Sequence, residues 1–359
     1  MKPTWRVLDT GLCRAAENIA LNRALLEARQ ADEIPSTLRF LRFQPCALLG
    51  FHQSAEQELN LEYCKEQGVD IQRRITGGGA IYFDQTQLGW ELYLHKRDLG
   101  TADMQVITRR ICEAAARGIQ VLGVDAQFRP RNDIEVDGRK ISGTGGAFDG
   151  DALMFQGTLL IQFDVEKMLR VLRIPAEKLS DKAIASARER VANLADLLSH
   201  VPEMQDVKAA LIHAFADEFD VNFEPGDLYA AEQARFDSAL AEIDTEDWVH
   251  MLSRPQSDVP IVEAIQKFPG GLVRANVAYD RARQRIKQVW FTGDFFVSPK
   301  RAIVDLEAAL RDIDVVDCRR RVLAFFAERE IDMMGLQPED FVVVIQSALS
   351  QFESRVTVP

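Results

Sequence analysis

Two clusters of glycine and basic residues in this sequence have the composition of a site for an anionic ligand. The first, residues 72–84, contains Arg73 and Arg74, and three consecutive glycines begin at Gly77. Glycine lets a backbone turn pass very close to another group, and a guanidinium can fork onto a carboxylate or a phosphate. This pattern favours an anion held against a turn, although on composition alone a glycine turn with surface arginines is the simpler interpretation.

Lys140 belongs to the second cluster. It follows the pair Asp137-Gly138, a strong type I′ turn signal that predicts a hairpin over residues 132–143. The glycine-rich stretch beside it could hold an anion through backbone N–H groups and one mobile cation. Taken alone, a lysine that protects a strand edge from aggregation is the better interpretation. Two such clusters in one chain favour a shared ligand cleft.

Neither cluster fits a known phosphate-binding loop. The first lacks the Gly-Lys-Ser/Thr ending of a Walker motif, and it is not followed by the helix that a dinucleotide fingerprint requires. Asp133, next to Asn132, could position Mg²⁺, which prefers one or two carboxylates together with substrate phosphates. Two turn residues that begin a strand are an equally good interpretation of this pair.

Cysteine and histidine give no sign of a metal site. The five cysteines are scattered without a CxxC pair, which suits a reducing compartment. Cys112 falls inside a predicted helix and is expected in the core. The five histidines form no HExxH pair. This pattern favours activation of a substrate by positioning and charge neutralisation.

The bulk composition limits the class of protein. At 359 residues, 47% hydrophobic and 27% charged, the chain is long for one core, which predicts two domains. A net charge of −12 argues against a nucleic-acid partner. No apolar run reaches membrane-spanning length, and the N-terminal residues lack the charged-then-apolar layout of a signal peptide, so we expect a cytoplasmic protein. Prolines within residues 245–260 place the domain boundary between 1–248 and 249–359.

Both strand and helix patterns occur along the chain. We expect residues 37–43 to pair with 46–50 as a hairpin, and 80–83 to pair with 88–94. Residues 270–279 and 286–296 are expected to form a further strand pair. Helices are predicted over residues 15–30, 60–67, 102–122, 165–172, 191–198, 207–219, 228–242, 301–311, 318–330 and 338–352.

Four motifs in order resemble those of lipoate–protein ligases. They are residues 73–82, 131–144, 156–160 and 180–194, which span most of the first 200 residues. The resemblance implies a biotin/lipoate ligase-type α+β catalytic domain, with mixed and antiparallel sheets flanked by helices. A weaker likeness over residues 271–296 implies a small, fused α+β accessory domain at the C-terminus.

The resemblance also implies a reaction with ATP, Mg²⁺ and lipoate. Lipoate would form lipoyl-adenylate, and the lipoyl group would pass to a lysine of a lipoyl domain or a glycine-cleavage-H-like protein. Lys140 would be the catalytic residue, because its charge stabilises developing negative charge, and Asp133 would hold the metal. The implied lipoate- and adenylate-binding residues are Arg73, Arg74, Thr76, Gly77, Gly78, Gly79, Ala80, Tyr82, Asn132, Asp133, Ser142, Gly143, Thr144, Gln156, Gly157, Thr158 and Lys182.

Two positions depart from the family pattern, because Phe83 and Gln156 stand where histidine is common. Gln156 can form hydrogen bonds but cannot carry a proton at neutral pH. Residues 179–186 are expected to be mobile without ligand and to order over the adenylate.

Other functions stay open. One is an octanoyl or lipoyl transferase that needs no ATP; such transferases use a cysteine near the site lysine, and no cysteine lies between Lys140 and Cys318. A cysteine-free amidotransferase stays open as well, because some relatives lack the cysteine–lysine pair. Another is a non-catalytic lipoate-binding module, which the retained charged residues disfavour. A biotin ligase is disfavoured because its GRGRxGR motif is replaced.

Overall fold

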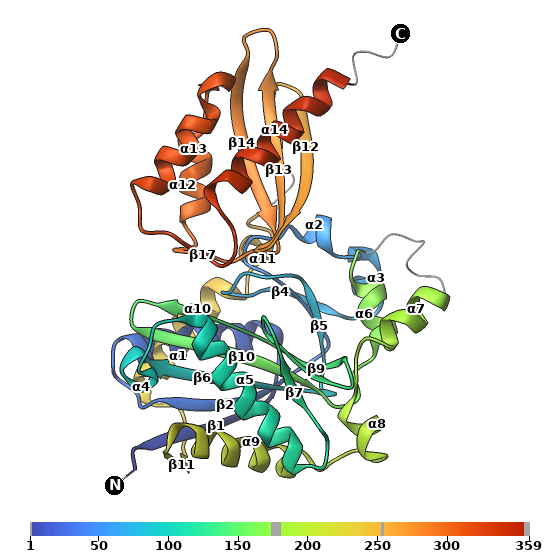
Figure 1. Cartoon of the computed structure of the whole chain (residues 1–359), viewed down its shortest axis with the longest axis vertical. Coiled ribbons are helices and arrows are strands. Elements are labelled where there is room, and N and C mark those ends of the chain that lie inside the picture. Colours follow the sequence, from blue (N-terminus) through green and yellow to red (C-terminus); the bar gives the residue numbers. More distant parts are fainter. Residues whose placement is uncertain (1, 174–180, 253–254, 355–359) are drawn as a thin grey trace. The chain divides into compact units, whose positions relative to one another are not determined.

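The chain divides into two compact units in a computed structural model that describes residues 2–173, 181–252 and 255–354 (Figure 1). The first unit comprises Met1–Ala47, Glu62–Gln72 and Tyr82–Trp248. The second comprises Val249–Pro359 together with Leu48–Leu61 and Arg73–Ile81. Two segments from the first half of the chain therefore belong to the second unit. The predicted division between residues 248 and 249 did not assign them there.

A mixed eight-stranded sheet forms the centre of the first unit. In sheet order its strands are β11 (Asn222–Pro225), β1 (Thr4–Cys13), β2 (Thr37–Phe43), β6 (Gln87–His95), β10 (Ala152–Leu160), β9 (Arg139–Asp149), β8 (Asp133–Val136) and β7 (Gln127–Arg129). β1 pairs in parallel with β11 and β2, and every other neighbouring pair is antiparallel. The predicted α+β class is confirmed.

Helices of the first unit pack on both faces of this sheet. α1 contacts β2, β6 and β10, and α5 contacts α9 and the strands at the β7 end. The helices are α1 (Ala15–Gln30), α3 (Leu61–Glu66), α4 (Lys96–Leu99), α5 (Met104–Val121), α6 (Val165–Val171), α7 (Asp181–Arg188), α8 (Leu194–Leu198), α9 (Met204–Phe219), α10 (Ala230–Ile243) and α11 (Glu246–Val249). No helix of the described residues is both long enough and apolar enough to cross a membrane.

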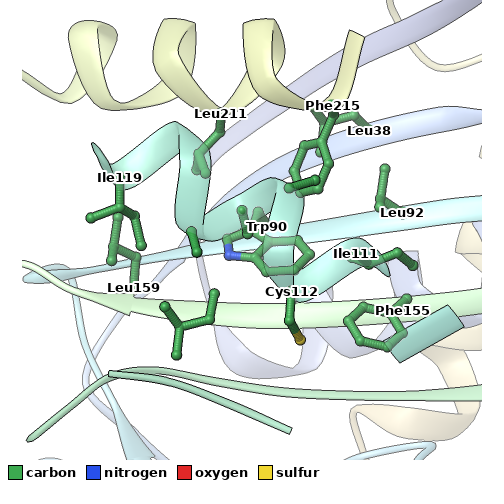
Figure 2. Packing of buried hydrophobic residues seen from close by; sticks show 14 of the residues in the cluster. Leu38, Trp90, Leu92, Ile111, Cys112, Ile119, Phe155, Leu159, Leu211 and Phe215 are labelled. Carbon is green, nitrogen blue, oxygen red and sulfur yellow. The ribbon is translucent and has the colours of Figure 1, made fainter. Parts of the chain in front are cut away.

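The main hydrophobic core lies between the sheet and the pair α5 and α9. Figure 2 shows Trp90 of β6 among side chains of both helices. Its ring lies 5.3 Å from Phe215 and 6.2 Å from Phe155, measured between centroids. Residues alternate between the two faces of a strand, so residues one position away from Trp90 and Phe155 lie on the opposite face.

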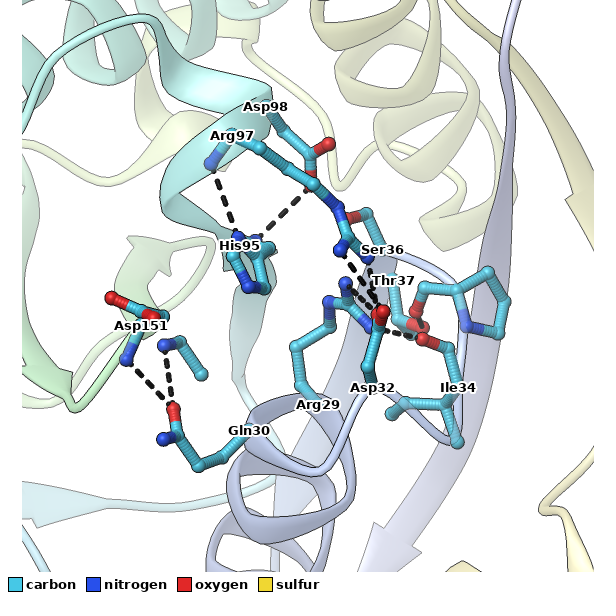
Figure 3. A network of polar contacts seen from close by, with 12 residues as sticks. Arg29, Gln30, Asp32, Ile34, Ser36, Thr37, His95, Arg97, Asp98 and Asp151 are labelled. Carbon is cyan, nitrogen blue, oxygen red and sulfur yellow. Dashed lines mark hydrogen bonds and ion pairs between the residues drawn. The ribbon is translucent and has the colours of Figure 1, made fainter.

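A polar network fixes the C-terminal end of α1 (Figure 3). Asp32, in a left-handed backbone conformation with φ of 57°, accepts hydrogen bonds from Arg29 at 2.7 Å and Arg97 at 2.9 Å. These two guanidinium groups lower the pKa of the Asp32 carboxyl. Ser36 donates to Asp98 at 2.6 Å. The network thereby joins α1, α4 and the start of β2.

Both hairpins predicted in the first hundred residues are wrong. β3 (Cys46–Leu49) pairs with β4 (Asp70–Arg73) and β5 (Ile81–Phe83) in a separate three-stranded sheet of order β4-β3-β5. β2 instead pairs with β6, and β6 with β10. An alternating pattern shows which face of a strand is apolar, but it does not specify which other strand will pair with it, because several strands have a similar apolar face.

The second unit is built on a four-stranded antiparallel sheet. Its order is β12 (Ile261–Phe268), β13 (Gly271–Asp280), β14 (Arg285–Gly293) and β16 (Ile313–Asp314). The predicted pairing of residues 270–279 with 286–296 is confirmed by β13 and β14. The remaining elements are α2 (Ala55–Glu58), β15 (Val297–Ser298), α12 (Ala302–Ala309), a 3-10 turn (Val315–Asp317), α13 (Cys318–Ala327), β17 (Asp332–Met333) and α14 (Pro338–Ser354).

Glu307 makes the second unit sensitive to pH. It lies on α12 and accepts a 2.7 Å hydrogen bond from the backbone N–H of Phe291. Burial raises the pKa of its carboxyl from 4.5 to about 7. Between these values the folded chain keeps a proton that the unfolded chain has released, so the folded state loses stability as the pH rises.

We therefore expect Glu307→Gln to stabilise the second unit at pH 8 by about 2 kcal/mol and to change little at pH 4.5. Glutamine keeps an acceptor for Phe291 and cannot ionise. Urea unfolding at both pH values measures the effect, with Glu328→Gln as an exposed control. The same pH dependence in Glu307→Gln and wild type would contradict this role.

Candidate active site

The β8–β9 hairpin carries the lysine singled out in the sequence. Asp137 and Gly138 form its turn with φ of 51° and 75°, the two positive values of a type I′ turn. The predicted hairpin is confirmed. Lys140 Nζ lies 2.8 Å from Asp133 Oδ1, and these side chains are 42% and 27% exposed. The amine is therefore held by one carboxylate while remaining open to a ligand.

Gly143 provides the surface under this amine. A β-carbon added at Gly143 would lie 2.7 Å from Lys140 Nζ, closer than real β-carbons approach other atoms. The Nζ of Lys140 therefore occupies the space that a side chain at position 143 would need. Thr158 of β10 pairs with Gly143 and donates to its carbonyl at 3.4 Å. We call the side of the sheet that bears Asp133, Lys140, Gly143 and Thr158 the lysine face.

Ser142 and Thr144 lie on the opposite side of β9, toward the core. The Ser142 hydroxyl is buried and has no hydrogen-bond partner among the described residues. Thr144 donates to the Asn132 carbonyl at 2.8 Å, and Asn132 Nδ2 donates to the Thr144 carbonyl. Cys112 Sγ of α5 lies 3.2 Å from Thr144 Oγ1. Asn132 and Thr144 thus clamp β8 to β9 beside Asp133, and the Asn132 amide is engaged in that clamp.

The backbone of Lys140 is joined to the segment after α7. Lys140 N donates to the Arg190 carbonyl at 2.9 Å, and Ala192 N donates to the Lys140 carbonyl at 2.8 Å. Lys182 falls on α7, but its side chain is outside the described part of the chain. Within the predicted mobile stretch, residues 179 and 180 also lie outside the described residues.

Gln156 and Gly157 lie side by side on β10 with different surroundings. Gly157 packs under the Trp90 ring, which a β-carbon there would meet at 2.2 Å. Gln156 pairs with Glu91 of β6 and Gly145 of β9, and paired residues share a face. Gln156 therefore lies on the lysine face, next to a residue without a side chain.

A buried ion pair beside Gln156 was missed from the sequence. Glu91 lies 3.1 Å from Arg39 and accepts from Asn22 of α1 at 2.6 Å. Both charged side chains are almost fully buried. The available signal is the charged residue within the apolar strand Leu88–Leu94, because a buried charge requires a partner.

In the second unit, Arg73 is fully buried by carbonyl groups. Its Nη1 donates to the carbonyls of Gly50, Phe51 and Gln53 at 3.1, 2.9 and 2.5 Å, and its Nη2 donates to Val249 at 2.7 Å. Burial lowers the pKa of the Arg73 guanidinium to about 10. Arg73 thus holds the backbone of residues 50–53 in place. The sequence had suggested only a role in ligand binding for this arginine.

Arg74 folds the glycine-rich loop in the same way. It donates to the carbonyls of Leu48 at 2.9 Å, Gly77 at 3.1 Å and Gly79 at 2.8 Å. Gly78 has φ of 91°, and a β-carbon on Gly50 would lie 1.8 Å from the Gly78 carbonyl oxygen. Backbone approaches backbone here too closely for side chains. Some of the glycines are therefore required by packing within this unit, whatever ligand the loop takes.

The residues flanking the glycines have separate environments. The Thr76 carbonyl accepts from Phe51 N at 2.9 Å in the second unit, where Ala80 is half-buried. In the first unit, Tyr82 donates to Asp84 at 2.9 Å, and burial raises the pKa of its phenol. Phe83, in place of the expected histidine, stacks near Phe43 with ring centroids 4.7 Å apart.

None of the chain's five thiols, all of which lie in described residues, is activated as a nucleophile. Burial raises the pKa of every one of them, to about 11 for Cys112 and Cys318. A nucleophilic cysteine requires the opposite shift and an accessible sulfur. Cys112, although its Sγ contacts Thr144, is fully buried.

Asp133 is the carboxylate that the lysine face offers to a metal ion. Among the described residues no group of three or more histidine, cysteine or acidic side chains is placed to hold a metal. A single carboxylate fits Mg²⁺ bound mainly through substrate phosphates and water. It does not fit an ion bound by protein groups alone.

Comparison with known proteins identifies the fold family. Residues 14–216 match the model of the lipoyl protein ligase A/B catalytic domain. Lipoate-protein ligase A subunit 1 of Thermoplasma acidophilum is 30% identical over 245 residues, covering 64% of this chain and 90% of that protein. Octanoyltransferase LipM of Kyrpidia tusciae is 28% identical over 269 residues, covering 68% and 98%.

Solved structures agree with this assignment. The bipartite lipoate protein ligase of T. acidophilum superposes with a TM-score of 0.61 at 28% identity, covering 71% of this chain and 99% of that one. A lipoate-protein ligase A bound with ATP gives 0.58 at 26% identity, covering 70% and 100%. Plasmodium falciparum LipL1 gives 0.73 at 18% identity and covers 97% and 99%, which extends the fold likeness past the catalytic domain. The chain belongs to the lipoyl protein ligase A/B catalytic domain family and carries a C-terminal extension beyond that domain.

Proposed function

We propose that this chain is an ATP-dependent lipoate–protein ligase. The observation that carries the proposal is the Lys140 amine, held on Asp133 above a position without a side chain, with no reactive thiol beside it. The family includes ATP-dependent ligases and octanoyltransferases at similar identity. The chemistry of the site has to decide between them.

Lys140 can serve both half-reactions. In the first, an oxygen of the lipoate carboxylate attacks the α-phosphorus of ATP, and the bond to pyrophosphate breaks. The ammonium group has three N–H donors, so Lys140 can keep its ion pair with Asp133 while donating to a phosphate or carboxylate oxygen. A fixed positive charge there stabilises the negative charge that develops on those oxygens.

In the second half-reaction, the ε-amine of an acceptor lysine attacks the acyl carbon, and the bond to the AMP oxygen breaks. Lys140 stabilises the developing oxyanion and the departing phosphate from the same position. The missing side chain at Gly143 leaves the Lys140 amine its place beside β9, where it can meet the mixed anhydride. Mg²⁺, held by Asp133 and the phosphates, would supply further neutralisation of phosphate charge.

The remaining expected site residues take supporting roles in this proposal. Asn132 and Thr144 fix Asp133 in place through their clamp, and Gln156 and Thr158 line the lysine face as hydrogen-bonding groups. Arg73 and Arg74 shape the glycine-rich loop, whose backbone we assign to the adenylate. The acceptor would be a lipoyl domain or a glycine-cleavage-H-like protein.

ATP-independent octanoyl transfer is the alternative function. It proceeds through an acyl-enzyme and needs a thiolate at the site. The thiol that contacts the clamp beside Asp133 is that of the buried, protonated Cys112. Its raised pKa favours the adenylating ligase.

Lipoate-dependent pyrophosphate release from ATP, measured without an acceptor, tests the proposal. We expect release by wild type and a loss of at least 100-fold in Lys140→Ala, because the charge that stabilises the transition state is removed. The Lys140–Asp133 pair is partly exposed, so its loss should cost under about 1 kcal/mol of stability. Lys65→Ala, an exposed lysine of α3, is the matched control. A Lys140→Ala variant that is folded and fully active would contradict the assignment of Lys140 as the catalytic residue.

Gly143→Ala should lower the rate of pyrophosphate release by roughly tenfold or more, since a β-carbon would displace the Lys140 amine. The lysine end is flexible, so the thermal midpoint should change little. The double variant Gly143→Ala/Lys140→Ala should be no slower than Lys140→Ala alone. Multiplicative losses in the double variant would mean that Gly143 acts independently of the lysine.

Cys112→Ala should retain acyl transfer from lipoate and ATP to within about threefold, because the thiol stays protonated at neutral pH. Transfer assays with lipoate plus ATP and with octanoyl carrier protein, run in parallel, measure both activities. Octanoyl transfer by wild type that disappears in Cys112→Ala would establish the alternative function.

A further inference from the structure

Among the strands that end a sheet, β12 of the second unit is the longest. It has eight residues, whereas the others in the described part of the chain have two to four. β13 pairs with one side of β12, α14 contacts one face, and no strand of the described residues pairs with the other side (Figure 1). An edge of this length is a template for pairing with another chain.

The opposite border of the same sheet is closed by the protein itself. β16 pairs with the first two residues of β14. Further along β14, Phe291 N donates to the Glu307 carboxyl at 2.7 Å, and Gly293 N donates to the His52 carbonyl at 2.9 Å. These contacts occupy the border at β14, so the edge of β12 is the one left for a partner strand.

The register identifies the backbone groups that β12 leaves unpaired. Pro260, directly before the strand, accepts a 3.0 Å hydrogen bond from Tyr279 N at the end of β13, and the two strands pair antiparallel. Bonding directions alternate along a strand, so the even-numbered residues of 262–268 bond to β13. The N–H and carbonyl groups that point out of the edge include those of Glu263, Ile265 and Lys267.

The side chains of these three residues are exposed and lie on one face of the strand. Ile265 is 46% exposed, an unusual position for a large apolar side chain. Lys267 has no ion-pair or hydrogen-bond partner among the described residues. Glu263 lies 3.8 Å from Arg274, which also contacts Glu58 of α2. We call Glu263, Ile265 and Lys267 the β12 edge.

The β12 edge is complementary to itself about Ile265. When two copies of β12 lie antiparallel across a twofold axis at Ile265, this residue meets its own copy and Glu263 meets Lys267 on both sides of the axis. Opposite charges directly across from each other stabilise an antiparallel pair, and like charges destabilise it. An axis at Glu263 or Lys267 would put like charges opposite each other, and an axis at residue 264 or 266 would pair neither glutamate with a lysine.

We propose that a second copy of this chain binds along the β12 edge, so that two four-stranded sheets join into one eight-stranded sheet. The paired residues exchange N–H···O bonds without rearrangement, because their backbone groups already point outward. The interface is isologous, since both copies use the same surface, and it closes at the dimer. This inference concerns the second unit and is independent of the proposed reaction.

Charge-exchange variants test both the interface and its register. Glu263→Lys places lysine opposite lysine in both pairs that the axis generates, and Lys267→Glu places glutamate opposite glutamate. The double variant Glu263→Lys/Lys267→Glu restores opposite charges with their positions exchanged. The matched controls are Glu330→Lys and Arg319→Glu, which make the same changes of charge at exposed residues of the second unit outside β12.

Sedimentation equilibrium of the full chain measures the association. We expect a reversible dimer with a dissociation constant of about 1 to 100 µM, because a single strand pair lies at the small end of protein–protein interfaces. Each single exchange should raise this constant by roughly tenfold or more, and the double variant should return to within about threefold of wild type. The two control variants should match wild type.

Ile265→Pro removes the outward N–H at the axis and leaves the bonds to β13, since an edge strand accepts proline where the N–H faces solvent. We expect this variant to be monomeric with an unchanged circular dichroism spectrum. A wild type that stays monomeric well above the expected concentration range would overturn the proposal, as would a dimer that persists in Ile265→Pro. Single exchanges without effect, or a double variant no tighter than the single ones, would also overturn it.

Discussion

The ion pair between Lys140 and Asp133 is the interaction on which the candidate site depends. Its geometry needs three features of the strands around it: a type I′ turn that aligns β8 with β9, a clamp between Asn132 and Thr144, and no side chain at residue 143. Each feature is local to residues 132–144. The rest of the first unit supplies the rigid sheet that keeps this hairpin in place, through the core around Trp90.

Local signals in the sequence were sufficient for the hairpin that carries the site. An Asp-Gly pair between alternating strands specifies a two-residue turn almost by itself, and the helices follow from apolar periodicity. The pairing between strands that are distant in the sequence could not be predicted from such local signals. β3 and β5 leave their sequence neighbours and join β4, because nothing in residues 46–49 or 81–83 distinguishes one apolar partner from another.

The arginines illustrate a second limit of the sequence. Arg73 and Arg74 have the residue types of an anion site, and spacing alone cannot reveal that backbone carbonyls already surround both guanidiniums. A buried guanidinium needs such carbonyls, because its charge is costly to desolvate. Packing within the unit also explains some of the glycines beside them, since the backbones of Gly50 and Gly78 approach too closely for a side chain at Gly50.

The choice between adenylation and direct acyl transfer is a question of which group can bear charge at neutral pH. A thiol is a nucleophile only as its anion, and the low polarity around Cys112 raises its pKa to about 11. A lysine ammonium is already charged and needs no activation to stabilise an anion. The same burial that gives α5 its packing on the sheet therefore excludes Cys112 from covalent chemistry. Under the proposed ligase function, ATP supplies the activation of the carboxylate that a thiolate would supply in an acyl-enzyme mechanism.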